Sequence, residues 1–186
     1  YNFDQTSTLI IIQIIMKNGF LFLTLSILSF SAFAQNFKWA KSIGGSSYDY
    51  GNSIAVDASG NIYITGSFAG TVDFDPGAAI FNLTSAGDND IFILKLNASG
   101  SFVWAKRMGS VNSDYGQSID VDGIGNVYTS GYFQNTVDFD PGTGTSNLIS
   151  AGLGDIFILK LTSSGNFVWA KSMGGTLEDY ANSMAV

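Results

Sequence analysis

A phrase built around tryptophan recurs along this chain, and its period constrains the fold more than any other feature. Trp39, Trp104 and Trp169 follow one another at intervals of 65 residues, each inside the pattern Phe-x-Trp-Ala-Lys. Residues 37–101 align with residues 102–166 without a gap and are identical at about 38 of 65 positions. We interpret residues 167–186 as a truncated third copy. A chain of this kind buries its core by stacking neighbouring copies.

Alternating apolar residues and glycine turns predict four antiparallel strands for each repeat. The strands are expected at residues 53–57, 61–68, 90–96 and 101–108, with the second extended through 71–74 and a short extra strand at 80–83. Gly60 lies in the turn between the first two strands and supplies a residue that accepts positive φ. Asp90 to Leu96 is apolar on both faces, which a strand between two other sheets requires.

The predicted fold class is all-β. The 22 Gly, 15 Phe and 8 Tyr against 2 Pro suit short strands joined by glycine turns. Four-stranded sheets that cannot cover both faces alone favour the blades of a β-propeller, and a stacked β-solenoid is the alternative. Residues 37–42 are expected to form the fourth strand of a last blade whose other strands lie beyond residue 186. The structure should then contain two whole blades with orphan strands at both ends.

The start of the chain has the three parts of a secretory signal. Met16-Lys17-Asn18 is followed by the apolar run 20–30 and by Ala32-Phe33-Ala34. We predict a helical signal peptide at 16–34, repeats over 35–186, and a secreted or cell-surface product with no stable membrane span after cleavage. Residues 1–15 precede Met16 and are interpreted as a non-native upstream extension. If they were made, residues 9–34 could instead form an interrupted hydrophobic anchor.

Charge and composition exclude several classes of function. The net charge of −7 argues against a nucleic-acid partner, which requires clustered Lys and Arg. The chain has no Cys and no His, so it lacks disulfides, thiolate sites and a Ser-His-Asp triad. Each promising acid recurs in the next repeat, whereas a catalytic pair must differ from its surroundings. We therefore expect a protein that is not an enzyme.

Two stretches of the repeat resemble the D-x-x-G-N-x-Y-x-x-G core of SBBP-type β-propeller repeats. They are residues 57–66 and 122–131, and the resemblance covers nearly all of residues 37–186. It implies large bacterial proteins that are secreted or surface-attached, often with adhesion modules and a C-terminal sorting domain. It implies no common enzymatic activity. The Asp-Phe-Asp-Pro-Gly insertion departs from the family pattern.

The candidate binding residues lie in loops expected on one face of a propeller. The proposed ligand-binding set consists of repeated Asp-Tyr pairs: Asp49, Tyr50, Asp114, Tyr115, Asp179 and Tyr180. The tyrosines offer rings for stacking on sugars, whereas the tryptophans are expected inside the sheets with their indole N–H groups satisfied. Asp73, Asp75, Asp138 and Asp140 are weak metal candidates. Two carboxylates per copy are too few for a full Ca²⁺ loop, so turn capping is the favoured interpretation.

These inferences favour a non-enzymatic extracellular or cell-surface propeller that serves as a structural or adhesive interaction module. The expected partners are surface glycans or other extracellular proteins. The sequence specifies no cofactor. If the aspartates bound an ion, Ca²⁺ is the one that their oxygens would take. The alternative is a carbohydrate-binding or polysaccharide-acting propeller whose specific residues lie in a C-terminal part outside this sequence.

Overall fold

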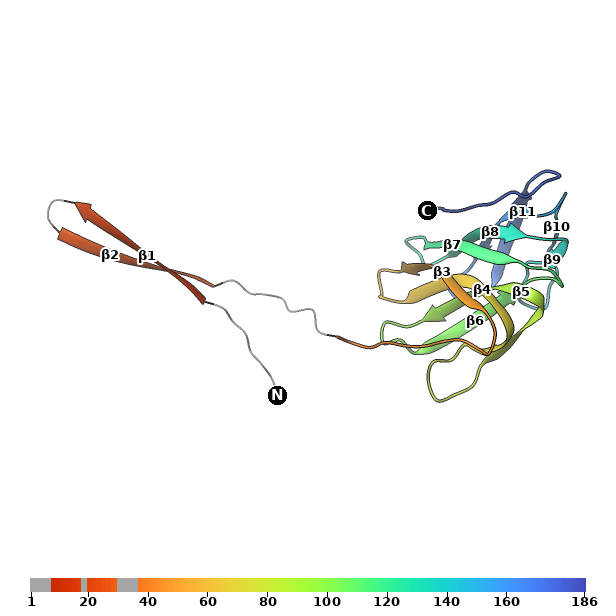
Figure 1. The fold of residues 1–186 in the computed structure, drawn as a ribbon, viewed down its shortest axis with the longest axis horizontal. Helices are drawn as coiled ribbons and strands as arrows, with labels where there is room; N and C mark the ends of the chain where they lie inside the picture. The colour runs from red at the N-terminus through yellow and green to blue at the C-terminus, as the bar shows by residue number, and fades with distance from the viewer. Residues whose placement is uncertain (1–7, 18–19, 30–36) are drawn as a thin grey trace. The chain divides into compact units, whose positions relative to one another are not determined.

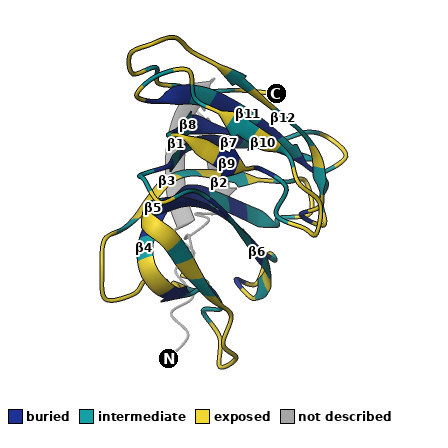
Figure 2. Ribbon diagram, turned by 90° about the vertical axis from the view of Figure 1, so that its right-hand side faces the viewer, coloured by how far each residue is buried: buried dark blue, intermediate teal, exposed yellow. Residues whose placement is uncertain are grey.

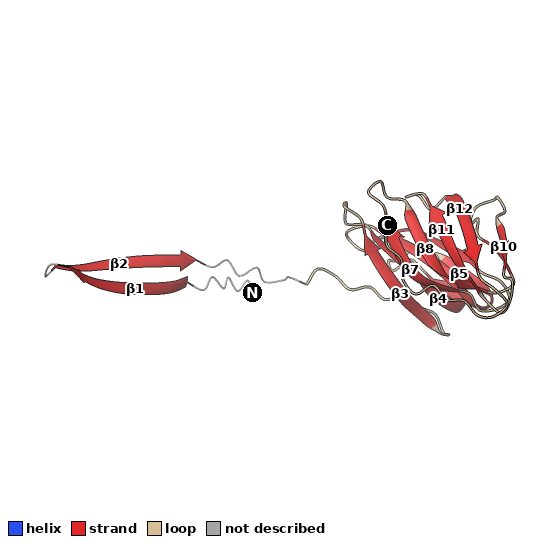
Figure 3. Ribbon diagram, turned by 90° about the horizontal axis from the view of Figure 1, so that it is seen from above, coloured by secondary structure: helices blue, strands red, loops and turns tan. Residues whose placement is uncertain are grey.

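The computed structural model describes the backbone of residues 8–17, 20–29 and 37–186 (Figure 1). The chain divides into two compact units, which are Tyr1–Lys38 and Trp39–Val186. Every regular element in the described ranges is a β-strand (Figure 3), which confirms the all-β prediction. Those ranges contain no helix of the length and hydrophobicity needed to cross a bilayer.

The first unit contains an antiparallel pair, β1 (Thr8–Lys17) and β2 (Phe20–Ser29). The helix predicted for the signal peptide is therefore not observed over residues 20–29. The sequence offers a physical reason, because a run rich in Ile precedes a run rich in Phe and Leu, and β-branched and aromatic residues favour strands when a partner satisfies their backbone groups. The predicted cleavage residues, Ala32 to Ala34, lie outside the described residues. The signal peptide stays a prediction.

The first sheet of the second unit has the strand order β3-β4-β5-β6. Its strands are β3 (Asp49–Val56), β4 (Ile62–Asp73), β5 (Asn82–Leu96) and β6 (Phe102–Met108). The four predicted strands are confirmed: β3 and β5 are longer than expected, and β4 includes the predicted extension as far as Asp73. Asp73 pairs with Asn82, so the predicted extra strand is the beginning of β5, with only Asn82 and Leu83 of its span in the strand.

The second sheet repeats this arrangement in the order β7-β8-β11-β12. Its strands are β7 (Tyr115–Val121), β8 (Val127–Phe133), β11 (Asp155–Leu161) and β12 (Phe167–Met173). A separate ribbon of β9 (Thr136–Asp138) and β10 (Asn147–Ile149) replaces the outer ends of β4 and β5. The interruption falls at Asn135, which has φ of 60° where the first copy has Gly70.

The two sheets pack face to face over a shared apolar core, and buried residues line the facing strands (Figure 2). Ile91 and Ile93 of the first sheet meet Phe133 and Phe157 of the second, all with no exposed surface. Face-to-face stacking of four-stranded antiparallel sheets is the packing of propeller blades. Trp104 donates its indole N–H to the Ser163 carbonyl at 3.2 Å, so its polar atom is satisfied by the neighbouring sheet.

Residues 37–42 and 183–186, the segments expected as orphan strands at the two ends of the repeats, do not form regular strands. Residues 37–42 have irregular backbone, which corrects the prediction of a strand there. The reason is that no neighbouring strand in the described structure supplies a ladder for them. Trp39 nevertheless lies against Gly100 as Trp104 lies against Gly165, with ring atoms 3.0 and 3.1 Å from a built Cβ. Trp39 therefore packs against the first sheet as Trp104 packs against the second, although it does not lie in a strand.

Candidate functional site

The aspartates of the predicted ligand face cap their own loops. Each carboxylate accepts a backbone N–H from four residues earlier: Gly45 to Asp49 at 2.7 Å, Ser110 to Asp114 at 2.6 Å and Gly175 to Asp179 at 2.7 Å. Asp114 is fully buried and also accepts the backbone N–H of Gln134 at 2.8 Å. Local bonds of this kind fix loop conformation. The aspartates are thus committed to the scaffold, and Asp114 most completely.

Asp90 and Asp114 place two buried carboxyl groups close to the seam between the sheets. Burial raises the pKa of Asp90. Hydrogen bonds from the Ala86 N–H and from the Arg107 guanidinium, which forms an ion pair with Asp90, lower this pKa but do not cancel the effect of burial. Burial also raises the pKa of Asp114 to about 6, and the charge of Asp90 adds to this effect. A carboxyl group with such a pKa is often functional, but Asp114 is sealed from solvent. We interpret it as structural.

The tyrosines of the predicted site behave differently in the two copies. Tyr50 stacks on Tyr48, with ring centroids 6.4 Å apart, and both rings are exposed. Tyr115 and Tyr180 both contact one further ring, Tyr132. Tyr115 stacks on Tyr132 at 4.8 Å, and Tyr180 meets Tyr132 edge-on at 4.7 Å. The structure therefore brings two of the three predicted tyrosines together.

Tyr132 is the residue that the sequence analysis missed. Its position in the first copy is held by Ser67, so a substitution that breaks an otherwise close repeat was the signal available. Burial raises the pKa of Tyr132 to about 12, with the neighbouring phenols and the acids Glu178 and Asp114 adding to the effect. The phenol is therefore a neutral hydrogen-bond donor at physiological pH.

Polar groups surround this tyrosine cluster, defined as Tyr115, Tyr132 and Tyr180. Asn89 donates to the Tyr115 hydroxyl at 3.3 Å, and Tyr180 donates to the Glu178 carboxylate. Tyr180 is 48% exposed, and the other two rings are half-buried. Aromatic faces beside hydroxyl, amide and carboxylate groups are chemically suited to a ligand with both apolar and polar faces.

The carboxylates of the four metal candidates accept hydrogen bonds from backbone N–H groups of their own loops. Asp73 accepts the backbone N–H groups of Asp75 and Phe81 at 3.0 and 2.8 Å, and Asp138 accepts those of Asp140 and Ser146 at the same distances. Asp75 and Asp140 in turn accept the N–H groups of Gly77 and Gly142 at 2.7 and 2.8 Å. Across residues 37–186 no three acidic side chains gather closely enough to hold an ion. The bonds match the turn-capping interpretation.

The residues of the D-x-x-G-N-x-Y motif form the hairpin turn between β3 and β4, at the ends of these strands away from the predicted ligand face. Asp57 accepts the backbone N–H groups of Ser59 and Asn61, both at 2.9 Å, and the Tyr63 hydroxyl at 3.1 Å. Gly60 has φ of 80°, which a residue with a side chain rarely adopts. Asp122, Asn126 and Gly125 repeat the arrangement in the second copy. The phrase therefore builds a turn.

Comparison with known proteins agrees with this geometry. The family described as Beta-propeller repeat, SBBP, matches residues 38–67, which contain β3, the Asp57 turn and the first half of β4. An uncharacterized WD repeat-containing protein of Acanthamoeba polyphaga mimivirus is 27% identical over 155 residues, which are 70% of this chain and 11% of that protein. Regulatory protein FlaEY of Caulobacter vibrioides is 25% identical over 128 residues, 69% of this chain and 13% of that protein.

The chain thus spans little more than a tenth of the length of these curated relatives. The matched residues include the complete Asp57 turn, the strand β3 before it and the first half of β4 after it, and the same turn recurs 65 residues later between β7 and β8. Because the repeat match and the stacked four-stranded sheets agree, this chain is a repeat protein of propeller type that resembles the SBBP β-propeller repeat at residues 38–67.

Proposed function

We propose that this chain supplies blades to an exported β-propeller that acts outside the cell as a non-enzymatic structural or adhesive interaction module. The observation that carries the proposal is the use of the recurring acids. The buried carboxylate of Asp114 and its equivalents Asp49 and Asp179 each hold a loop through a backbone N–H group. Acids committed in this way support a scaffold that presents loops to partners rather than catalysis.

Export is tested by fusing residues 16–186 to an alkaline phosphatase that is active only outside the cytoplasm. We expect enzyme activity in the periplasm of a bacterial host and a processed protein that begins at Gln35. The apolar run must partition into the translocation machinery, so Leu23→Arg with Leu25→Arg should abolish export. A reporter retained in the cytoplasm with an intact N-terminus would refute the extracellular part of the proposal.

A second candidate function is carbohydrate binding at the tyrosine cluster. The observation in its favour is that the second copy carries Tyr132 where the first copy has Ser67, and that this substitution joins Tyr115 to Tyr180. Sugar rings present C–H faces that pack on aromatic rings and hydroxyl groups that need polar partners. Asn89 and Glu178 lie against the phenols of the cluster and supply such partners.

The substitution Tyr132→Ser restores the residue of the first copy and tests this candidate. On a glycan array we expect the unaltered protein to bind a defined set of glycans. The affinity of the variant for them should fall about fivefold or more, since one aromatic contact contributes ~1 kcal/mol or more. Tyr48→Ser is the matched control, because Tyr48 is 73% exposed and belongs to the other copy. Absence of binding, or binding unaffected by Tyr132→Ser, would eliminate the glycan candidate.

A further inference from the structure

A slot of about 400 Å³ lies at the outer edge of the first sheet, between that sheet and the ribbon of the second copy. Its floor is the edge of β6 and the residue after it, residues 105–109. Phe81 and Leu83 of the first copy form one wall, and Asp138 and Asp140 of the second copy form the other. Elements of both copies surround the slot, so it belongs to the seam between the two copies.

The floor of the slot is an unpaired strand edge. Among the sheets that the structure describes in residues 37–186, β6 pairs only with β5, and β9 pairs only with β10. The backbone groups on the other edge of β6 therefore have no ladder partner. An extended segment placed in the slot continues the first sheet as an additional strand and satisfies these groups. The floor is thus suited to a polypeptide backbone.

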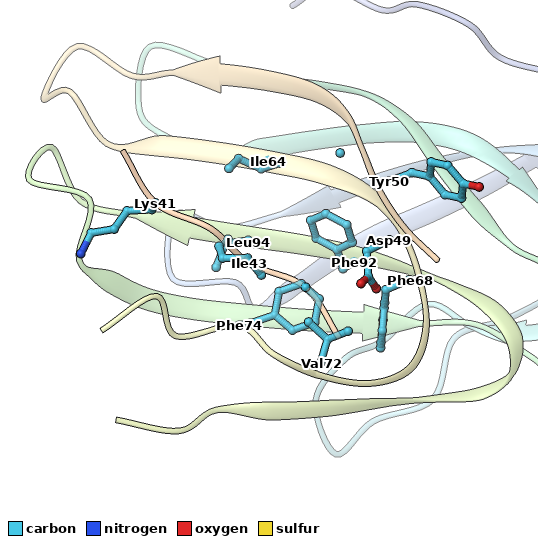
Figure 4. A pocket seen from close by; sticks show the side chains of 12 residues that line it. Lys41, Ile43, Asp49, Tyr50, Ile64, Phe68, Val72, Phe74, Phe92 and Leu94 are labelled. Atoms are coloured by element: carbon cyan, nitrogen blue, oxygen red, sulfur yellow. The ribbon is translucent and has the colours of Figure 1, made fainter. Parts of the chain in front are cut away.

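The first copy shows what the Asp-Phe-Asp-Pro-Gly wall can hold. Gly44 forms an isolated antiparallel bridge with Asp73, and the Lys41 Nζ donates to the Pro76 carbonyl at 3.5 Å. Lys41 also lines the apolar cavity of about 200 Å³ beside the first sheet (Figure 4). The equivalent segment of the second copy continues β6 and is held by β5, so the slot separates it from residues 138–142. The contacts that the wall makes in the first copy are therefore open in the second.

The charges beside the slot favour a basic occupant. Asp138 and Asp140 use their Oδ1 atoms for the hydrogen bonds of their own loop, which leaves the Oδ2 atoms for another partner. The cations of β6 are directed elsewhere. Arg107 forms an ion pair with Asp90, and Lys106 extends to the turn between β11 and β12, where it packs on a glycine. Carboxylates placed in this way attract a Lys or Arg side chain.

The opposite wall is apolar. Phe81 is 37% exposed, and its ring packs on Phe102 at 4.7 Å, which holds it at the slot. Leu83 is half-buried beside it. Successive side chains of a strand point to opposite faces of its sheet. A strand in the slot therefore directs one set of side chains to Phe81 and Leu83 and the other set to Asp138 and Asp140.

We propose that this slot binds an extended segment of a partner protein in which apolar and basic residues alternate. The segment joins the first sheet beside β6, with its apolar residues on Phe81 and Leu83 and its basic residues on Asp138 and Asp140. The proposal rests on the interaction module proposed above and names a class of partner for it. It also gives a role to the Asp-Phe-Asp-Pro-Gly insertion, which builds the acidic wall.

Fluorescence anisotropy with a labelled peptide of four Val-Lys pairs tests this proposal on the purified full chain. We expect saturable binding of this peptide and no binding of a peptide of four Val-Glu pairs. N-methylation of the main chain of the first peptide should abolish binding, because it removes the hydrogen-bond donors of the added strand. Hydrogen exchange of the amides of residues 105–109 should slow in the complex. Export by the fused reporter is a separate measurement, so its failure is distinguishable from a failure to bind the peptide.

Asp138→Asn combined with Asp140→Asn removes the charge of the wall and keeps the oxygens that cap the loop. We expect this variant to bind the Val-Lys peptide about fivefold more weakly, since two partly exposed ion pairs are lost. Asp73→Asn with Asp75→Asn is the matched control, because it changes the net charge equally in the copy whose wall already contacts residues 41–44. This control should bind like the unaltered chain. Absence of binding, equal weakening by both variants, or unchanged exchange at residues 105–109 would overturn the proposal.

Discussion

The substitution Phe139→Ala should destabilise the repeat unit by ~3–5 kcal/mol. Phe139 has no exposed surface and lies in the core shared by the two sheets. Its ring packs edge-to-face on Phe133 at 5.3 Å and against Phe157 at 4.8 Å. Truncation removes the transfer free energy of the ring and leaves a cavity between two sheets that cannot both collapse into it. Urea unfolding followed by tryptophan fluorescence measures the loss.

Phe74→Ala is the matched variant in the first copy. Phe74 makes the same ring contacts, with Phe68 at 5.2 Å and Phe92 at 5.0 Å, but it lines the cavity on the outer face. A ring that already borders free space loses fewer packing contacts on truncation, so we expect a smaller loss of ~2–3 kcal/mol. Equal or reversed effects would contradict the view that the core between the sheets is the better packed one.

The substitution Gly131→Ala is expected to cost ~3 kcal/mol or more, although it adds a single methyl group. A Cβ at this position would lie 1.9 Å from the Tyr115 carbonyl oxygen and 2.9 Å from the Phe157 ring. The oxygen belongs to the strand that pairs with β8 through Gly116 and Gly131. The backbone has to move, and the register shift between Gly116 and Ser118 would be disturbed. Thermal unfolding followed by circular dichroism measures the loss.

Gly123→Ala is the control for this substitution. A Cβ at Gly123 meets nothing within 4 Å, and the residue does not require positive φ. Alanine there should be neutral or slightly stabilising, because it lowers the entropy of the unfolded chain. A Gly131→Ala protein as stable as the Gly123→Ala protein would show that the strands adjust to the extra methyl group without cost.

Turn chemistry and alternation made most of the fold predictable from the residues. Strand 101–108 is observed to within one residue as β6, strands 61–68 and 90–96 form parts of the longer β4 and β5, and Gly60 has the positive φ predicted for its turn. The exceptions depend on partners. Residues 37–42 have the composition of a strand but no neighbour to pair with, and residues 20–29 pair with an Ile-rich strand instead of forming a helix.

The candidate site was predictable only in part. The loop acids and tyrosines could be named from the repeat. The hydrogen-bond partners of each carboxylate could not be predicted, because the oxygens of Asp114 accept hydrogen bonds from groups 4 and 20 residues away. Tyr132 lay in a strand and outside the predicted loops. Its role depends on Tyr115, which lies opposite it in the β7–β8 pairing, and on Tyr180, which reaches it from the segment after β12.

The 65-residue period therefore determined by itself that this chain folds as repeated, stacked β-sheets, because strand alternation and glycine turns act between residues near in sequence. Only the tertiary structure decided which copies of a repeated residue are buried, capped or free. Ile54 and Ile119 occupy the same position in the repeat, but the side chain of Ile54 is 64% exposed and that of Ile119 is 4% exposed. The difference arises because burial depends on which sheet covers a face, and that neighbour comes from another part of the chain.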